Sequence, residues 1–364
     1  MEFTNELLEK MERKKKDFNV KYSGWYYGMS EEFSEHKNKY YKRSERIANC
    51  LGVWNWDKYE KNKLLDLQSV YKCHNNRFCP NCKLLDISKF IHEFRKYYDE
   101  YSSKGYSAYM LTLTIPSVDA VSLRDTLSEL NNCFRKFTEK FSYESDNKKS
   151  YKDRYVKFEG GIKVLEITFS EEKGYHPHFH CVIFTKNPIK EELLNKYIRG
   201  KFSNKRNDYN YKSDMDIQLG KLWSMIWYKE KLTSKNIDTI VYDPKEKYFK
   251  DNKKCLEVDF RELDEKGIYE VFKYTFKDTD IKNYNVFKTL VQALENKRIR
   301  QGFGMLFNMQ CEEVEIGEVQ ELVLEIEENP ESLVTFEINN LITTYRNYHK
   351  ISRFNRQIDN NIKE

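Results

Sequence analysis

Three of the chain's seven histidines fall within five residues, in the stretch HPHFH at 176–180. An apolar run, VIF at 182–184, follows almost at once and reads as a core-bound strand. Alternate side chains of a strand share a face, so His176, His178 and His180 would all point to the same side. Neutral imidazole is the commonest metal-binding side chain, which favours a metal-binding strand over a merely polar strand face at a sheet edge.

Four of the eight cysteines cluster in the first quarter of the chain, at Cys50, Cys73, Cys79 and Cys82. The last two form a CxxC turn, whose short reach lets both thiolates bind one tetrahedral Zn²⁺. Cys73 and Cys50 would complete the site, with His74 competing for the fourth position. The pattern predicts a structural zinc site, because no thioredoxin-like pattern surrounds the turn to indicate redox chemistry.

A third group of reactive residues lies in YEVFKYTFK at 269–277. If 267–277 is a helix, Glu270, Tyr274 and Lys277 lie at i, i+4 and i+7 and share one face. A carboxylate, a phenol and an ammonium can supply a base, a nucleophile and a charge stabiliser. Alone, this pattern is more simply a surface Glu–Lys pair with a tyrosine between, so its interpretation as a catalytic group depends on the histidine strand.

The periodicity of the chain predicts the elements that would position these groups. The strands are expected at 109–116, 163–170, 176–184 and 255–262, and the second and third should form an antiparallel hairpin. Helices are expected in pieces within 1–45 and at 83–101, 120–141, 216–232, 267–277 and 329–352.

Composition narrows the class of protein. The 364 residues are 39% hydrophobic and 33% charged, which is typical of a folded, polar protein. No run of about 18 apolar residues is present, and the N-terminus lacks the apolar core of a secretory signal, so we expect a cytoplasmic protein. The net charge is +5 although residues 311–331 hold nine Glu and no other charged residue, so the rest of the chain is strongly basic. A basic body suggests a polyanionic partner.

Five segments, in order, resemble the rolling-circle replication initiators of small bacterial plasmids, which are single-tyrosine members of the HUH (His-hydrophobe-His) endonucleases. The resemblance covers roughly residues 46–316. The segments that carry it are YKCHNNRFCPNC at 71–82, YMLTLTIP at 109–116, GYHPHFHCVIF at 174–184, EVFKYTFK at 270–277 and LENKRIRQGFGML at 294–306.

The resemblance implies that His178 and His180 hold a divalent cation, Mg²⁺ or Mn²⁺. The wider class takes a third ligand from a neighbouring strand. Glu166 is the preferred candidate here, because the expected hairpin would bring it across from the histidines, and a hard oxygen ligand suits these ions. His176 is the alternative, and the sequence does not separate the two.

By the same resemblance, Tyr274 is the nucleophile of a metal-dependent nicking reaction that leaves a 5′-phosphotyrosine and a 3′-OH primer. Glu270 takes the position of a base that activates a terminating water, and Lys277 is a hypothesis for lowering the pKa of the phenol. A second subunit is the alternative for the second cleavage. The basic segment after the nucleophile implies DNA-binding residues at Lys297, Arg298 and Arg300.

The implied fold is α+β: an HUH-like central antiparallel sheet of about five strands with flanking helices, plus an N-terminal zinc-binding segment. We expect an N-terminal region at 1–105, a catalytic domain at 106–310, and an acidic segment with a C-terminal helix at 311–364. The expected partners are plasmid origin DNA, single-stranded or as an extruded hairpin, and the host helicase and polymerase. A homodimer stays open, and no membrane is involved. The alternatives are a relaxase or transposase of the same superfamily, or a zinc-dependent DNA-binding regulator without catalysis.

Overall fold

The computed structural model of the chain divides between Glu93 and Phe94 into two compact units. It describes residues 5–50, 54–59, 64–70, 73–142, 157–195, 197–198, 211–240, 248–250, 253–263, 271 and 281–309. The predicted domain limits at 105 and 310 stay a prediction, and the segment 311–364 lies outside the described residues.

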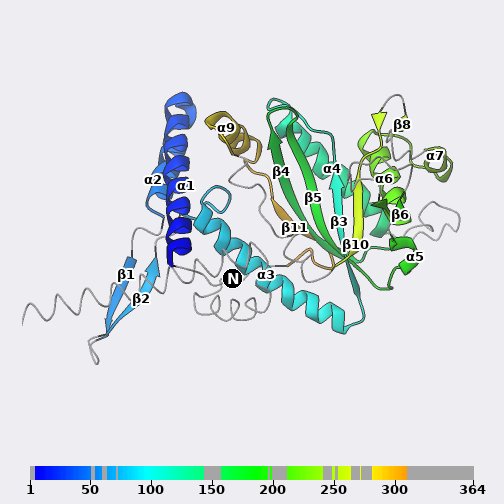
Figure 1. The fold of residues 1–364 in the computed structure, drawn as a ribbon, viewed down its shortest axis with the longest axis horizontal. Coiled ribbons are helices and arrows are strands. Elements are labelled where there is room, and N and C mark those ends of the chain that lie inside the picture. Colours follow the sequence, from blue (N-terminus) through cyan, green and yellow to red (C-terminus); the bar gives the residue numbers. More distant parts are fainter. Residues whose placement is uncertain are drawn as a thin grey trace, which may run out of the picture. The chain divides into compact units, whose positions relative to one another are not determined.

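The first unit contains a helical hairpin, α1 (Asn5–Glu32) and α2 (Lys37–Ala48), joined by a 3-10 turn at Ser34–His36. Both helices appear in shades of blue in Figure 1. Tyr22, Tyr26 and Met29 of α1 are almost fully buried, and their i, i+4, i+7 spacing gives the helix one apolar stripe. The helical pieces predicted for this region are confirmed.

A β-hairpin separates the first predicted zinc ligand from the second. Its strands β1 (Trp54–Tyr59) and β2 (Leu64–Val70) pair antiparallel. Helix α3 (Pro80–Ser103) begins inside the CxxC segment, with Pro80 at its first position, where a missing backbone N–H costs nothing. The hairpin thus explains the long gap between Cys50 and Cys73.

The second unit is organised around an antiparallel five-stranded sheet of order β10-β3-β5-β4-β11. Its strands are β3 (Ser107–Thr114), β4 (Gly160–Ser170), β5 (Gly174–Thr185), β10 (Val258–Glu262) and β11 (Arg300–Gly304). The predicted α+β fold is confirmed, and the histidine strand β5 is central, as expected (Figure 1).

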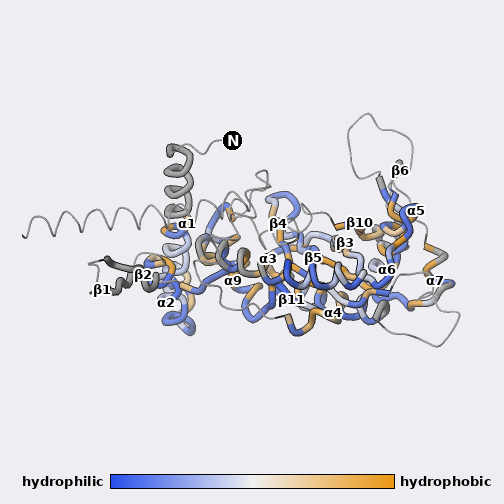
Figure 2. The backbone as a smooth tube through the Cα atoms, turned by 90° about the horizontal axis from the view of Figure 1, so that it is seen from below, coloured by the Kyte–Doolittle hydropathy of each residue, from blue (hydrophilic) through white to orange (hydrophobic). Residues whose placement is uncertain are grey.

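Two helices cover one face of this sheet. The ring centroid of Phe134 in α4 (Leu123–Ser142) lies 5.2 Å from that of Phe179 in β5. Trp223 in α6 (Asp214–Trp227) donates its indole N–H to the carbonyl of Thr114 at 2.7 Å. Figure 2 shows the strands from below, with α4 on one side of them.

The opposite face carries the histidines and is covered at one end by the last turns of α3. Phe94, Tyr98 and Tyr101 all place their rings within 6.4 Å of Phe184, centroid to centroid. Phe184 lies at the end of β5 that is far from the histidines. The three rings therefore cover that end of the face. The histidine end of β5 carries polar side chains instead.

Smaller elements complete the second unit. They are α5 (Glu191–Leu194), β6 (Tyr197–Ile198), β7 (Tyr211–Lys212), α7 (Ser234–Thr239), β8 (Tyr248–Lys250), β9 (Lys253–Lys254) and α9 (Tyr284–Ala293). Of the helix predicted at 267–277 only Val271 is described; it is helical and buried. The helix predicted at 329–352 lies outside the described residues. Throughout the described part of the chain, no helix is both long and apolar enough to cross a membrane.

Candidate functional site

Two adjacent strands bring a carboxylate against two imidazoles. Glu166 on β4 lies directly opposite His178 on β5, and His180 is the next residue of β5 on the same face. The Oε2 atom of Glu166 lies 3.1 Å from Nε2 of His178 and 2.7 Å from Nε2 of His180. The predicted hairpin therefore places Glu166 across from the histidines, as expected.

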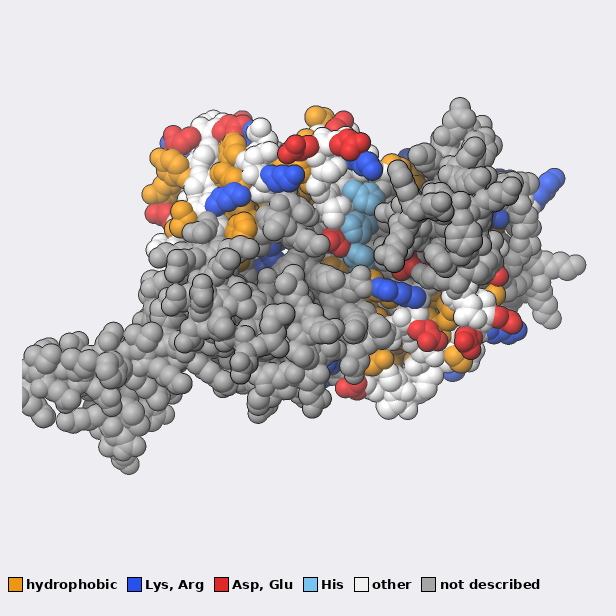
Figure 3. Space-filling model, in the orientation of Figure 1, with side chains coloured by type: hydrophobic (Ala, Val, Ile, Leu, Met, Phe, Trp, Pro, Cys, Tyr) orange, Lys and Arg blue, Asp and Glu red, His pale blue; other side chains and the backbone are white. Residues whose placement is uncertain are grey.

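Their surroundings make this group partly buried. The side chains of Glu166, His178 and His180 are 15%, 10% and 13% exposed. The histidines reach the surface of this face as one pale-blue group in Figure 3. The group is thus sheltered from bulk water yet accessible to a ligand from one side.

Electrostatics keep the carboxylate of this group ionised. Burial alone would raise the pKa of Glu166, but hydrogen bonds from His178 and His180 and the charge on their rings together hold that pKa far below its usual range. An ionised carboxylate beside two imidazole nitrogens is a ready cation ligand.

The donor set fits a divalent cation. The three ligand atoms lie within 4.8 Å of one another, so one ion could contact all of them. Two imidazole nitrogens and one carboxylate oxygen suit Mn²⁺ well and Mg²⁺ through the oxygen, with other positions open for water or substrate.

His176 lies beside the group but is not one of its members. Its ring centroid is 5.3 Å from that of His178, and burial lowers its pKa. Its backbone carbonyl accepts a hydrogen bond from Nδ1 of His178 at 3.1 Å. The structure thus brings Glu166, rather than His176, into contact with the other two side chains.

The predicted nucleophile, base and helper are Tyr274, Glu270 and Lys277, and all three lie outside the described residues.

The structure describes all three predicted DNA-binding residues, and they differ in their position and exposure. Arg300 pairs with Val164, which pairs with His180, so Arg300 lies on the same sheet face as the histidines. Arg298 is exposed, whereas Lys297 donates a hydrogen bond to the hydroxyl of Ser128.

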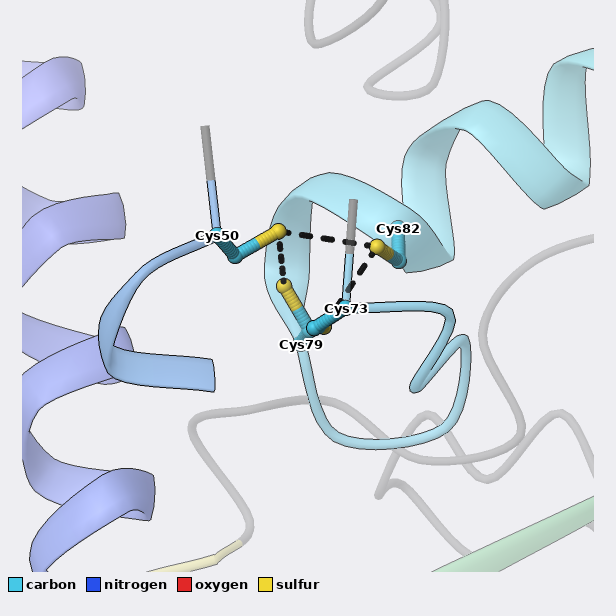
Figure 4. Close-up of side chains that lie close together, drawn as sticks. All are labelled: Cys50, Cys73, Cys79 and Cys82. Atoms are coloured by element: carbon cyan, nitrogen blue, oxygen red, sulfur yellow. Dashed lines mark hydrogen bonds between the residues drawn. The ribbon is translucent and has the colours of Figure 1, made fainter. Parts of the chain in front are cut away.

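The four clustered cysteines form a second candidate metal centre, in the first unit. Cys50 comes just after α2, Cys73 and Cys79 lie on the loop that leads into α3, and Cys82 lies in the first turn of α3 (Figure 4). The Sγ–Sγ distances are 3.6 Å for Cys50–Cys82, and 3.5 Å for both Cys73–Cys82 and Cys79–Cys50. Thiolates held at 2.3 Å by a tetrahedral Zn²⁺ are about 3.8 Å apart, so the spacing fits zinc.

Neighbouring groups support the cysteine cluster. Hydrogen bonds from Cys50, Cys73 and Cys79 lower the pKa of Cys82, which favours a thiolate there. The backbone N–H of Asn75 donates to Sγ of Cys73 at 3.4 Å, and the side chain of Asn75 donates to the Tyr26 hydroxyl at 3.3 Å. His74, the competing ligand, is exposed and is not among the four clustered residues.

Comparison with known proteins places the chain among replication proteins. The model of a family described as "Replication protein" matches residues 64–350. A curated "Protein rep" of Bacillus amyloliquefaciens is 26% identical over 77% of this chain and 76% of its own length. "Protein rep" of a Bacillus species is 25% identical over 78% and 84%. One from Staphylococcus aureus is 26% identical over 60% and 76%. No solved structure gives a significant match.

Proposed function

We propose, from the premise that this chain belongs to the replication protein family, that it initiates rolling-circle replication by nicking one strand at a plasmid's double-strand origin. The observation that carries the proposal is the contact of Glu166 with His178 and His180 on the open end of a sheet face. A regulator without catalysis would have no use for such a group.

The chemistry of the site follows from its charges. A divalent cation held by Glu166, His178 and His180 would polarise the scissile phosphate and offset the negative charge that develops on it. Arg300, on the same sheet face, is suited to bind a neighbouring phosphate, and the exposed Arg298 would add to backbone binding. These contacts would hold the DNA strand so that the attacking oxygen, the phosphorus and the leaving 3′-oxygen lie in line.

Tyr274 is the proposed nucleophile. Its phenol oxygen forms a bond to phosphorus as the bond from phosphorus to the 3′-oxygen breaks, which leaves a 5′-phosphotyrosine and a 3′-OH primer. An unperturbed tyrosine has a pKa near 10, so Lys277 is proposed to stabilise the phenolate. Glu270 is proposed to activate the water that releases the strand at termination. The alternative is that a second subunit makes this second cleavage.

The proposal also covers the zinc centre, the partners and the cellular compartment. The four-cysteine centre is proposed to hold structural Zn²⁺. Origin DNA is the substrate, presented single-stranded or as an extruded hairpin, and the host helicase and polymerase would extend the primer. The protein would act in the cytoplasm.

A nicking assay tests the proposal. Zinc-loaded protein is incubated with a supercoiled plasmid that carries its origin, with Mn²⁺ or with EDTA, and the products are run on a denaturing gel. The expected result is metal-dependent open circles with protein attached to a 5′ end. Tyr274→Phe should lower nicking by roughly 10³-fold or more, because the attacking oxygen is lost. Tyr27→Phe, a change at an exposed tyrosine, is the control.

Two results would redirect the assignment. Binding of origin DNA without a nick or an adduct would favour the zinc-dependent regulator. Nicking that survives in Tyr274→Phe with the adduct on another tyrosine would favour a relaxase or a transposase of the same superfamily.

A further inference from the structure

We infer that Thr112 is a positioning residue that fixes which nitrogen of His180 faces the cation. The inference rests on the proposed metal-dependent function. Thr112 lies on β3, in direct register with His180 on β5. Its hydroxyl Oγ1 is 3.1 Å from Nδ1 of His180.

The need for such a residue follows from the chemistry of imidazole. A neutral ring carries one proton, and only the nitrogen without it can bind a metal ion. For His178 the question is settled by the backbone, because the His176 carbonyl can only accept a hydrogen bond and so requires a proton on Nδ1. Nε2 of His178 faces Glu166 at 3.1 Å and is the nitrogen whose proton a cation would replace.

Nδ1 of His180 faces the Thr112 hydroxyl instead of a backbone carbonyl. Nε2 of His180 lies 2.7 Å from Oε2 of Glu166, a hydrogen bond that needs a proton on Nε2. When a cation replaces that proton, the neutral ring carries its one proton on Nδ1, and the Thr112 hydroxyl oxygen, 3.1 Å away, accepts it. Thr112 is only partly exposed, so water replaces its hydroxyl poorly. Removing that oxygen would free the ring to adopt the other tautomer or to rotate.

Thr114 provides a matched comparison on the same strand and the same face. It lies opposite His178 in register, yet its hydroxyl donates to the backbone carbonyl of Glu257 at 2.9 Å. The two threonines therefore differ in role: Thr114 connects β3 to the segment before β10, and Thr112 orients a ligand. Loss of the Thr114 hydroxyl should leave cation binding unchanged.

Mn²⁺ titration of zinc-loaded full-length protein tests the inference, with bound Mn²⁺ followed by electron paramagnetic resonance. Thr112→Val keeps the shape of the side chain and should raise the Kd for Mn²⁺ about 10- to 100-fold, the usual loss when a partner of a metal ligand is removed. Thr112→Ser restores a hydroxyl and should bind within about threefold of the unchanged protein. Thr114→Val should also bind within about threefold. The melting temperature of each metal-free variant is recorded beside its Kd.

The outcomes separate the inference from the proposed function. If the unchanged protein shows no Mn²⁺ site that disappears in His178→Ala/His180→Ala, the proposed metal-dependent function fails, and the inference with it. If that site exists but Thr112→Val binds Mn²⁺ as tightly as the unchanged protein, only the inference is overturned. Equal weakening in Thr112→Ser or in Thr114→Val would also overturn it, because the effect would then be structural.

A second measurement needs no variant and applies even if Thr112→Val does not fold. Long-range ¹H–¹⁵N spectra of the Mg²⁺-loaded unchanged protein report which ring nitrogens carry protons. The expected pattern is a proton on Nδ1 and none on Nε2 in both His178 and His180. A proton on Nε2 of His180 would contradict the assignment to Thr112.

Discussion

Lys163 is buried on the face of β4 opposite to Glu166. It is 6% exposed, and its ammonium donates to Oδ1 of Asn131 at 2.6 Å. The same ammonium lies 4.6 Å and 4.8 Å from the ring centroids of Phe134 and Phe179. Burial lowers the pKa of Lys163 to about 8, so the two rings and one hydrogen bond offset only part of the lost hydration.

Replacing Lys163 with Met should therefore stabilise the protein at neutral pH. The pKa of Lys163 is about 8 in the folded protein against an ordinary 10.5, so below pH 8 the folded state carries the full cost of a buried charge. That cost corresponds to about 3 kcal/mol of unfolding free energy. Between pH 8 and 10.5 the unfolded chain binds the extra proton, so wild-type stability rises with pH and the advantage of Met disappears. Denaturant unfolding at pH 7 and at pH 10 measures both values.

Lys186→Met, at an exposed position, is the control and should change the unfolding free energy by less than about 0.5 kcal/mol. The partly exposed Asn131 can bond water in the Met variant, so its amide oxygen is not stranded. A loss of stability in Lys163→Met at pH 7 would mean that the rings and Asn131 outweigh the desolvation.

At the level of single residues, the sequence predicted partners that are close along the chain. Glu166 could be predicted because β4 and β5 form a local hairpin whose register follows from alternation. Thr112 could not, since it meets His180 only through the pairing of β3 with β5, which is distant in sequence and leaves no periodic signal of its own. Tyr274 remains a prediction.

Among the elements, the contact between β4 and β5 depends on Gly161, near the start of β4. A Cβ atom on Gly161 would lie 1.9 Å from the backbone oxygen of Val182. Only a residue without a side chain permits this approach of the two strands. The register that sets Glu166 opposite His178 is part of the same strand pair.

Gly161→Ala should therefore destabilise the protein by at least about 3 kcal/mol, because a backbone atom must shift to admit the methyl group. The matched change Gly24→Ala, in α1, meets nothing within 4 Å and should instead stabilise by about 0.5–1 kcal/mol. Thermal and denaturant unfolding of the two variants gives the comparison. Equal effects would show that the strands can separate at little cost.

The elements that the sequence predicted are those with strong local periodicity. The helices α3, α4 and α6 and the strands β3, β4, β5 and β10 were all expected close to their observed bounds. Strand β11 was missed because its sequence, RQGFG, lacks the alternation of apolar and polar residues that marks a strand. The strand forms by pairing with β4, where it meets Gly160 and Gly161. Helix α9 was missed despite a readable signal, since Asn283 caps it by accepting from the backbone N–H of Val286. The hairpin β1–β2 was missed as well.

At the scale of the whole molecule, the chain carries two groups of metal-binding residues of opposite chemical character. The first unit offers four sulfurs, and the second offers two imidazoles and a carboxylate. Soft thiolates select zinc, whereas mixed oxygen and nitrogen ligands suit Mn²⁺ or Mg²⁺. The resemblance to rolling-circle replication initiators is confirmed by the family match over residues 64–350, which covers both groups except for Cys50.

This division of ligands predicts that the two groups bind metal independently. Elemental analysis of the purified protein should find about one zinc per chain, because a buried four-cysteine centre binds zinc tightly. His178→Ala/His180→Ala should retain that zinc while losing Mn²⁺ binding. Cys79→Ser/Cys82→Ser should lose the zinc, and Cys133→Ser, at a buried cysteine outside the cluster, should keep it.

Stability should follow the zinc. Metal binding to a site that exists only in the folded state contributes directly to folding, so a strong chelator should lower the melting temperature of the unchanged protein. The same chelator should have little effect on Cys79→Ser/Cys82→Ser, which has no zinc to lose. Zinc lost from the histidine variant but retained by the cysteine variant would reverse the assignment and place the tightly held ion beside Glu166.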